Sequence, residues 1–398
     1  MKKLLVIVLL LQFALYPLGA IEPSNPSFTV SLTSRLDSLL KDTLLARSEV
    51  GLIVYDLTAD TLLYSYQAEK LYRPASIQKI MTAVTALGHL GSDHSFNTTL
   101  YHTGDITPDS LLQGDLYIVG GFDPLINHLD IEAFAQAVYH SGIRRIEGGL
   151  IGNASLKDSL KWGSGWCWDD GMPILTPLLS ERQDSFLVHL RHSLSAQGID
   201  VADTTDTLVA QAPDSLLMQI AVSRRPLTQI MERMMKNSDN LHAEAVFYQL
   251  AAANAQHPYA TANDGAKMIH KLIKEIGHQP THYNMADGSG VSLYNYLSPA
   301  LMMDVLRYAY AHPEIFRPLY LSLPIAGIDG TLKNRMKNTA AYRRVRAKTG
   351  TLTGVISLAG YAEATNKHTL GFVIINQNVL TPRPIRAWQD KVCDALCK

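Results

Sequence analysis

The chain has 398 residues, of which 47% are hydrophobic and 18% charged, and its 35 basic and 36 acidic side chains leave a formal net charge of -1. This length exceeds what one ordinary core holds and indicates two or three domains, while the hydrophobic fraction excludes a disordered or collagen-like chain. The balanced charge excludes the basic face that nucleic-acid binding needs, and three cysteines are too few for a dense disulfide framework.

The first twenty residues have the pattern of a secretory signal peptide. Lys2 and Lys3 precede an apolar run that begins at Leu4, and the stretch closes on Gly19 and Ala20. A charged start, an apolar middle and a small-residue end are typical of such signals, and a membrane anchor is the alternative. We therefore expect residues 1–20 to be a signal peptide and the protein to be exported to the periplasm.

The segment that follows has the patterns of a helix, a hairpin and a second helix. Leucines recur with a helical period through residues 31–48. Residues 50–55 and 61–66 are rich in aliphatic and aromatic side chains on either side of a polar turn, which predicts a β-hairpin. Pro74 then opens a helix with one apolar face, and the glycines at 88 and 91 end it.

The pattern of the sequence changes between about residues 95 and 223. Short strand-like pieces alternate with Gly, Asp and Pro turns, and helical periods are few. The pieces are residues 98–102, 114–119 and 148–151. This stretch predicts a separate β-rich lobe.

Helical patterns return after Pro226, and strands and a last helix follow. The expected helices are residues 227–235, 241–252, 265–276 and the terminal 385–398, and the expected strands are 344–349, 355–363 and 368–376. Strands near both ends of the chain predict one sheet assembled from both termini. We therefore expect a main domain formed by residues 21–95 and 224–398, interrupted by an inserted accessory domain at 96–223.

Ser76 and Lys79 lie three residues apart at the opening of the helix that follows Pro74. This spacing puts a hydroxyl and an amine on one helix face. A serine becomes a nucleophile when a base is within hydrogen-bond reach, and a lysine with a lowered pKa can be that base. The same spacing recurs at Ser38 and Lys41 within the first helix, so chance is the alternative for the pair taken alone.

Two further motifs follow in the chain. Ser238, Asp239 and Asn240 stand just before a predicted helix, where they also suit an ordinary N-cap. Lys348-Thr349-Gly350 falls in a predicted strand, where a lysine can hold a carboxylate and a glycine lets a substrate backbone approach. An ordinary strand with a surface lysine is the alternative. Together the three motifs occur in the order found in penicillin-binding proteins and class A β-lactamases.

Further segments make the chain resemble the class C low-molecular-mass penicillin-binding proteins, the D-alanyl-D-alanine carboxypeptidase/endopeptidase family of serine peptidases. The shared segments are Gly114–Pro124, Met235–Glu244, Asp287–Gly290, Leu297–Pro299, Leu323–Leu332 and Ala347–Gly354. The resemblance covers roughly residues 50 to 376 and implies an α/β (α+β) transpeptidase fold, similar to that of β-lactamases, in which helices flank an antiparallel sheet.

The resemblance also implies roles for the motif residues. Ser76 would be the acylated nucleophile and Lys79 its general base, while Ser238 would relay a proton to the leaving amine and Asn240 would bind the substrate amide. Lys348, Thr349 and Gly350 would hold the terminal carboxylate and the substrate backbone, with the backbone N–H groups of Ser76 and Thr351 as oxyanion hole. The implied partners are peptidoglycan stem peptides and cross-links, with β-lactam antibiotics as inhibitors.

Some features depart from the family or leave alternatives open. The insertion between the first two motifs is short for the family, so we expect a single accessory lobe, and Leu293 stands where the family has an arginine. A serine β-lactamase and a non-catalytic protein that binds β-lactams or peptidoglycan are the alternative functions. No cluster has zinc spacing, so we expect no metal or cofactor and interpret Cys167, Cys393 and Cys397 as buried or unpaired thiols. The oligomeric state and peripheral membrane contact are left open.

Overall fold

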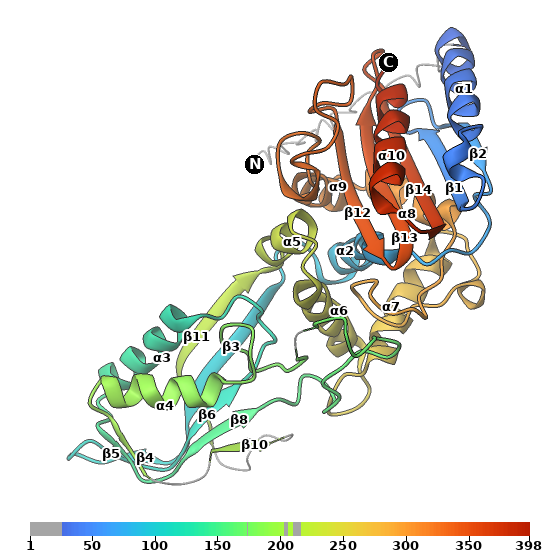
Figure 1. Cartoon of the computed structure of the whole chain (residues 1–398). Coiled ribbons are helices and arrows are strands. Elements are labelled where there is room, and N and C mark those ends of the chain that lie inside the picture. The colour runs from blue at the N-terminus through green and yellow to red at the C-terminus, as the bar shows by residue number, and fades with distance from the viewer. Residues whose placement is uncertain (1–25, 173, 203–205, 210–215) are drawn as a thin grey trace, which may run out of the picture.

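The computed structural model describes residues 26–172, 174–202, 206–209 and 216–398, so the predicted signal peptide at 1–20 lies outside the described residues. Its main sheet joins the two ends of the chain (Figure 1). In spatial order the strands are β12 (Val345–Leu352), β13 (Gly354–Glu363), β14 (Thr369–Val379), β1 (Glu49–Asp56) and β2 (Thr61–Tyr66). All neighbours are antiparallel, and β1 pairs with β14 from Glu49 opposite Gln377 to Asp56 opposite Leu370. The sheet predicted from both termini is confirmed.

Two terminal helices cover one face of this sheet. Helix α1 (Pro26–Leu40) and helix α10 (Pro382–Leu396) pack against the same apolar cluster as Leu52 and Val54 (Figure 1). The first helix is shorter than the predicted 31–48, because the chain turns through a 3-10 helix at Thr43–Leu45 that Asp42 caps. Strand β1 can then begin at Glu49.

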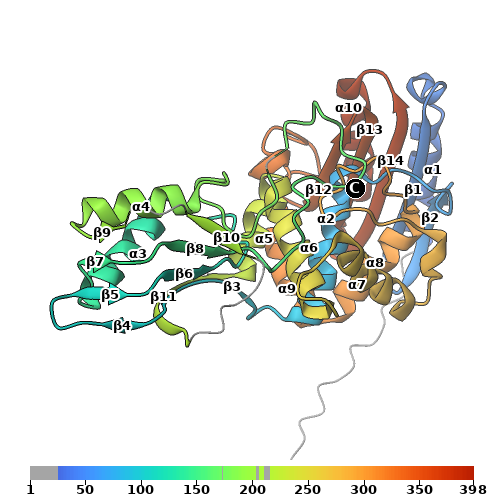
Figure 2. The same cartoon turned by 90° about the horizontal axis from the view of Figure 1, so that it is seen from below.

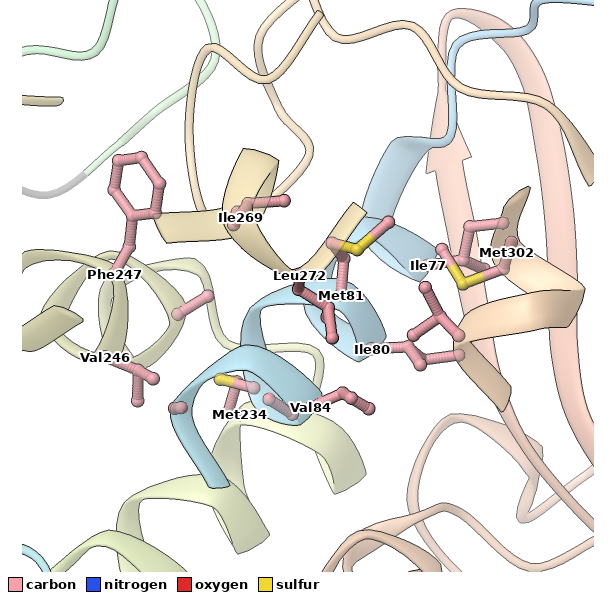
Figure 3. Packing of buried hydrophobic residues seen from close by; sticks show 14 of the residues in the cluster. Ile77, Ile80, Met81, Val84, Met234, Val246, Phe247, Ile269, Leu272 and Met302 are labelled. Carbon is pink, nitrogen blue, oxygen red and sulfur yellow. The ribbon is translucent and has the colours of Figure 1, made fainter. Parts of the chain in front are cut away.

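The opposite face packs on a helical layer whose central member is α2 (Gln78–Leu90). Residues 78 to 87 of α2 are all buried, and Figure 3 shows Ile80, Met81 and Val84 of α2 packed among side chains of neighbouring helices. The neighbours are α5 (Leu227–Lys236), α6 (Asn240–Asn254), α7 (Ala262–Glu275), α8 (Pro299–Ala311) and α9 (Pro313–Ser322). Helices α8 and α9 were not predicted, although each begins with a proline in its first turn and Ser298 caps α8, both ordinary start signals.

The inserted lobe has its own sheets and its own core. Within the described residues one sheet has the order β10 (Thr207–Val209), β8 (Leu150–Asn153), β6 (Leu116–Val119), β3 (Ser95–His102) and β11 (Met218–Pro226). A second has the order β4 (Asp105–Ile106), β5 (Leu111–Gln113), β7 (Arg145–Ile146) and β9 (Asp200–Val201). Figure 2 shows this lobe extending to one side of the main domain.

Two helices in the lobe correct the expectation that helical periods are few there. Helix α3 (His128–His140) starts with a capping box formed by Asn127 and Asp130, and helix α4 (Phe186–Ala196) lies beside it (Figure 1). Their apolar faces join the strands in a separate cluster that includes Phe134 and Leu190. The lobe is therefore a sheet with helices packed on it.

Strands β3 and β11 mark where the chain enters and leaves the lobe. They pair antiparallel, with Ser95 opposite Pro226, so the two connections between the lobe and the main domain lie side by side. We propose on this basis that residues 96–223 form the inserted domain, and that 21–95 and 224–398 form the main domain. Among the described residues, none of the helices has both the length and the apolar character needed to cross a membrane.

Candidate active site

Ser76 stands in a tight turn that leads directly into the central helix. The 3-10 helix Ala75–Ile77 precedes α2, and Ala75 has a φ of 50°, in the left-handed region. A Cβ added at Gly290 would lie 2.0 Å from the Ala75 carbonyl oxygen, so the neighbouring loop packs directly against this turn. Strained backbone of this kind persists where the surrounding structure holds it, as at active sites.

Lys79 lies one turn after Ser76 and is fully buried. Its Nζ is 2.9 Å from Ser76 Oγ, 2.7 Å from Asn240 Oδ1 and 2.7 Å from the carbonyl oxygen of Ser289. Burial lowers the pKa of Lys79 to about 8, although Asp287 and Glu244 act in the opposite direction. The amine therefore loses its proton far more readily than an exposed lysine, as a general base must.

The second motif forms the turn between α5 and α6. Ser238 has a φ of 58°, and Asp239 caps α6 by accepting a hydrogen bond from the His242 N–H. This confirms the N-cap reading for Asp239, while Ser238 and Asn240 point to the two buried lysines. Burial acts to raise the pKa of Asp239, but hydrogen bonds and charge from His242 and Arg182 outweigh it and hold this pKa well below its usual range.

Lys348 extends from β12 toward the same turn. Its Nζ donates to Ser238 Oγ at 2.7 Å and to the Thr349 carbonyl at 2.7 Å, and the side chain is fully buried. Burial, and then the charge of Lys79, hold the pKa of Lys348 well below that of a free lysine. Thr349 Oγ1 lies 2.8 Å from Thr331 Oγ1. The alternative, an ordinary strand with a surface lysine, is therefore excluded, since Lys348 is fully buried.

Strand β12 is the edge of the main sheet and runs past the Ser76 turn. A Cβ added at Gly350 would lie 2.1 Å from Ser357 Oγ and 2.9 Å from the Ser76 nitrogen, so only glycine lets the strand approach this closely. The Ala347 N–H points away from β13, because it donates to the Pro324 carbonyl. By the two-residue period of a strand, the N–H of Thr351 points to the same side of β12, away from β13.

The structure brings together six of the eight site residues predicted from the sequence. Ser76, Lys79 and Asn240 are in direct contact, as are Ser238 and Lys348, and Gly350 packs beside the Ser76 nitrogen. Thr349 and Thr351 lie next to Gly350 on β12, but their side chains contact Thr331 and Arg386 instead. The second serine–lysine pair does not belong to the site, because Ser38 and Lys41 are exposed at the far end of α1. The Arg386 guanidinium donates to Thr351 Oγ1 at 3.1 Å.

Two buried carboxylates were not assigned a role from the sequence. Glu244 on α6 accepts from the backbone N–H groups of Ser289 at 2.8 Å and Gly288 at 3.4 Å. Asp287 accepts from the N–H groups of Gly290 and Ser292, each at 2.7 Å. Both residues lie in segments that carry the family resemblance, but only the fold shows that they hold one loop beneath Lys79.

Residues 154–172 and 174–185 of the inserted lobe reach back over the main domain as a strap, seen as the green loops near α6 in Figure 2. Trp166 Nε1 donates to Asp287 at 2.8 Å, and Asn240 Nδ2 lies 3.3 Å from Met172 Sδ. Arg182 forms a salt bridge of 2.7 Å with Asp239. The strap therefore contacts two motifs of the site directly.

Leu293, which stands where the family has an arginine, bonds through its backbone to the strap and to the segment before Ser76. The N–H of Leu293 donates to the Gly165 carbonyl at 3.1 Å, and its own carbonyl accepts from Arg73 Nε at 3.1 Å. Arg73 also lies over the Tyr296 ring at 5.7 Å. The backbone of Leu293 thus links the strap to the segment just before Ser76.

The cysteines are free thiols in the described part of the chain, as interpreted from the sequence. Cys393 and Cys397 are buried in α10, and burial raises the pKa of both. Cys167 forms, with Asp169 and Asp170, a group of potential metal ligands whose atoms lie within 4.8 Å of one another. It lies in an exposed turn in which the Cys167 N–H donates to Asp170, which explains the grouping without an ion.

The known proteins that this chain resembles in sequence are D-alanyl-D-alanine carboxypeptidases. Residues 32–179 and 178–395 match the D-Ala-D-Ala carboxypeptidase 3 (S13) family. The chain is 26% identical to the D-alanyl-D-alanine carboxypeptidase of Actinomadura sp. strain R39, over 95% of this chain and 87% of that protein. It is 24% identical to the D-alanyl-D-alanine carboxypeptidase DacB of Haemophilus influenzae, over 82% and 85% of the two chains.

Solved structures show the same fold. The crystal structure of penicillin binding protein 4 from Haemophilus influenzae superposes with a TM-score of 0.81 at 21% identity, covering 93% of this chain and 99% of that one. The sequence match spans nearly all of the described residues and includes each element that carries the site. The chain therefore belongs to the D-Ala-D-Ala carboxypeptidase 3 (S13) family.

Proposed function

We propose that this enzyme hydrolyses the terminal D-Ala-D-Ala amide of peptidoglycan stem peptides through an acyl-enzyme on Ser76. The observation that carries the proposal is the environment of Lys79. Two acceptors, Asn240 Oδ1 and the Ser289 carbonyl, face its amine in addition to Ser76 Oγ. A neutral amine has two N–H groups and one lone pair. With both N–H groups donated to these acceptors, the lone pair faces the Ser76 hydroxyl.

Acylation follows from this arrangement. Lys79 accepts the Ser76 proton while Oγ attacks the carbonyl carbon of the penultimate D-Ala, and the developing oxyanion is met by the N–H groups of Ser76 and Thr351. One such donor typically contributes about 3 to 4 kcal/mol. The C–N bond then breaks as Ser238 gives its proton to the leaving amine and takes in its place the proton that Lys79 removed from Ser76. Water then attacks the ester carbonyl: its OH group joins the acyl carbon, the bond to Ser76 Oγ breaks, and the other water proton returns to Ser76 through Lys79.

The substrate is held by polar groups on both sides of the scissile bond. Asn240 would bind the substrate amide, and Lys348 with Thr349 would hold the terminal carboxylate against the edge of β12 that faces away from β13. Gly350 allows the peptide backbone to approach that edge. A β-lactam carries an equivalent amide and carboxylate, and a second structure of the Haemophilus protein is of a complex with a β-lactam. We therefore expect penicillin to acylate Ser76.

A groove of about 510 Å³ supports the cleavage of cross-links as well. It is lined by Thr331, Gly330, Asp329, Asn237, Lys236 and Glu232, and it begins where Thr331 meets Thr349. Thr349 would hold the carboxylate of the leaving residue, so the groove lies on the leaving-group side. In a carboxypeptidase substrate the leaving D-Ala ends at Thr349, before the groove. In a cross-linked peptide the leaving part is longer and would extend into the groove. An export signal at 1–20 would place the enzyme in the periplasm, where both substrates occur.

The test uses residues 21–398 with a D-Ala-D-Ala muropeptide and with labelled penicillin. We expect D-alanine release by the wild type, none by Ser76→Ala, and wild-type release by Ser38→Ala, which carries the matched serine–lysine spacing. Penicillin turnover without D-alanine release would instead identify a β-lactamase. Stable labelling without any peptide turnover would identify a binding protein. Loss of labelling in a folded Ser38→Ala would mean that the nucleophile is misassigned.

A further inference from the structure

Four backbone N–H groups that donate to buried carboxylates fix the loop of residues 287–292, which we call the carbonyl loop. The N–H groups of Gly288 and Ser289 donate to Glu244, and those of Gly290 and Ser292 donate to Asp287. On its other side the loop meets α2 through its carbonyl oxygens. Thr82 Oγ1 donates to the Gly288 carbonyl at 2.7 Å, next to the contact between Lys79 and Ser289.

The carbonyl of Ser289 decides the orientation of the base. If it moved away, the amine of Lys79 would keep only Asn240 as a fixed acceptor, and its lone pair would no longer be directed at Ser76. A displacement of about 1 Å at a reacting group can cost about 100-fold in rate. Glu244 is the side chain that holds the N–H groups of the two peptides before this carbonyl, Asp287–Gly288 and Gly288–Ser289, while Asp287 holds the N–H of the Ser289–Gly290 peptide itself.

We propose that Glu244 is a positioning residue for the general base, whose carboxylate fixes the carbonyl loop so that Ser289 directs the lone pair of Lys79 at Ser76. This inference rests on the proposed function, since it assumes that Lys79 is the base. Glu244 itself does not reach the reacting atoms. It acts through the loop.

The charge of Glu244 has a second effect on the same amine. Ionised Glu244 raises the pKa of Lys79, together with Asp287 and Asp239. Glu244 is fully buried, and burial, reinforced by Asp287, raises its own pKa to about 8, against the hydrogen bonds from Ser289 and Gly288. The charged or titratable groups that face it are Asp287 from the loop, Lys79 from α2, Lys157 from the strap and Tyr248 from α6 itself.

Two substitutions of Glu244 distinguish the effect of its side-chain length from the effect of its charge. Glu244→Asp keeps the charge and shortens the side chain, so penicillin acylation should slow by about 10- to 100-fold with the acid limb of its pH profile in place. Glu244→Gln keeps the size of the side chain and removes its charge. It also places an NH2 group, which cannot accept a hydrogen bond, against the Gly288 N–H. Acylation should slow similarly, and the acid limb should move to lower pH because Lys79 loses a neighbouring anion. Non-covalent penicillin affinity should stay near wild type in both.

The experiment measures the acylation rate at saturating penicillin from pH 5 to 10, with thermal unfolding of each variant. Gln249→Leu is the matched control, because Gln249 is also buried on α6 but contacts Gly121 and not the loop; its acid limb should not move. Thr82→Val frees the loop from its other side without removing a charge, so it should slow acylation and leave the acid limb in place. It also tests the loop if the Glu244 variants do not fold.

Two results would overturn the inference. One is a folded Glu244→Gln that acylates at the wild-type rate with the wild-type acid limb. The other is a Thr82→Val that acylates at the wild-type rate, since the loop would then not position the base. D-alanine release by the wild type is scored in the same preparation, so failure of the carboxypeptidase assignment is seen separately from failure of the Glu244 role.

Discussion

The buried amine of Lys79 distinguishes Ser76 from an ordinary serine. Lys79 is placed where water does not reach it, so its charged form is disfavoured although Asp287 and Glu244 lie nearby. Its three contacts are all with acceptor oxygens, which suits the charged amine at rest. Loss of one proton converts the same geometry into a base that faces Ser76.

The rate of acylation should therefore rise with pH through the pKa of Lys79, about 8. The neutral amine is the reactive form, so below this pH the rate should fall about tenfold for each unit of pH. Stopped-flow measurement of penicillin acylation from pH 5 to 10 checks this. Lys79→Arg, which stays charged throughout, should be inactive across the range. An acid limb near pH 4 would assign the base to a carboxylate instead.

At the scale of secondary-structure elements, the strap couples the inserted lobe to the start of α6. Arg182 contacts both carboxylate oxygens of Asp239, at 2.7 and 3.3 Å. Asp239 is the residue between the two functional side chains of its motif, and it caps the helix that carries Asn240. The lobe therefore helps to hold Ser238 in its left-handed conformation.

We expect Arg182→Gln to lower the free energy of unfolding by about 1 kcal/mol, because Arg182 is partly exposed, and to slow acylation. The low pKa of Asp239 means that its ion pairs stabilise the fold above the ordinary aspartate pKa of about 4, and that this contribution is lost as the pH falls further. Urea unfolding should show the difference at pH 6 and a smaller one at pH 3. Arg233→Gln is the control, since Arg233 lies 3.4 Å from Asp239 and should matter less. Equal effects of the two variants would argue against the strap.

Helix α5 contributes the wall of the groove on the leaving-group side. Glu232 is exposed and lines this groove, whereas Gln229 is exposed on the same helix and does not. Glu232→Trp should narrow the groove and reduce cleavage of a cross-linked dimer by about tenfold relative to D-alanine release, which corresponds to about 1.4 kcal/mol. Gln229→Trp should change neither rate. Parallel loss of both activities in Glu232→Trp would show that the groove does not select the substrate.

Sequence patterns located the parts of this site that are local and missed those that depend on packing. Ser76 and Lys79 share one helical turn, and Lys348 and Gly350 share one strand, so their motifs could be found by spacing, and the order of the motifs with the family resemblance supplied their predicted roles. The contacts of Glu244 with Ser289 and of Trp166 with Asp287 join segments 45 and 121 residues apart. No periodicity records such pairs, because they arise only when the helices pack. Helices α3, α8 and α9 had start signals in the sequence, such as the Asn127–Asp130 capping box and the prolines that open α8 and α9, but these were not used.

At the scale of the whole molecule, contacts between α1 and α10 join the two ends of the chain in addition to the pairing of β1 with β14. Trp388 on α10 is buried, and its Nε1 donates to the Leu39 carbonyl at the end of α1 at 2.9 Å. Cys393 and Cys397 pack in the same cluster as Leu32 and Leu36. The terminal helices therefore form a single cover on the sheet.

Trp388→Phe should lower the free energy of unfolding by about 1 to 3 kcal/mol, because it removes a buried donor and leaves a small cavity. Denaturant titration measures this difference. Trp168→Phe is the matched control, since Trp168 is 95% exposed, and it should stay within about 0.5 kcal/mol of wild type. A Trp388→Phe variant as stable as the control would show that α1 and α10 are not energetically coupled.

The pairing of β1 with β14 also sets an order of events during synthesis. A ribosome delivers the Ser76 turn long before the edge strand with Lys348 and the strands that connect it to β1. Contacts so distant in sequence form slowly, since the long loop between them must first close. In the proposed mechanism, Ser76 therefore acquires the Thr351 oxyanion donor only after β12, β13 and β14 have been made. We expect a chain truncated before β12 not to be acylated, so that penicillin labelling would report only molecules in which β14 has paired with β1.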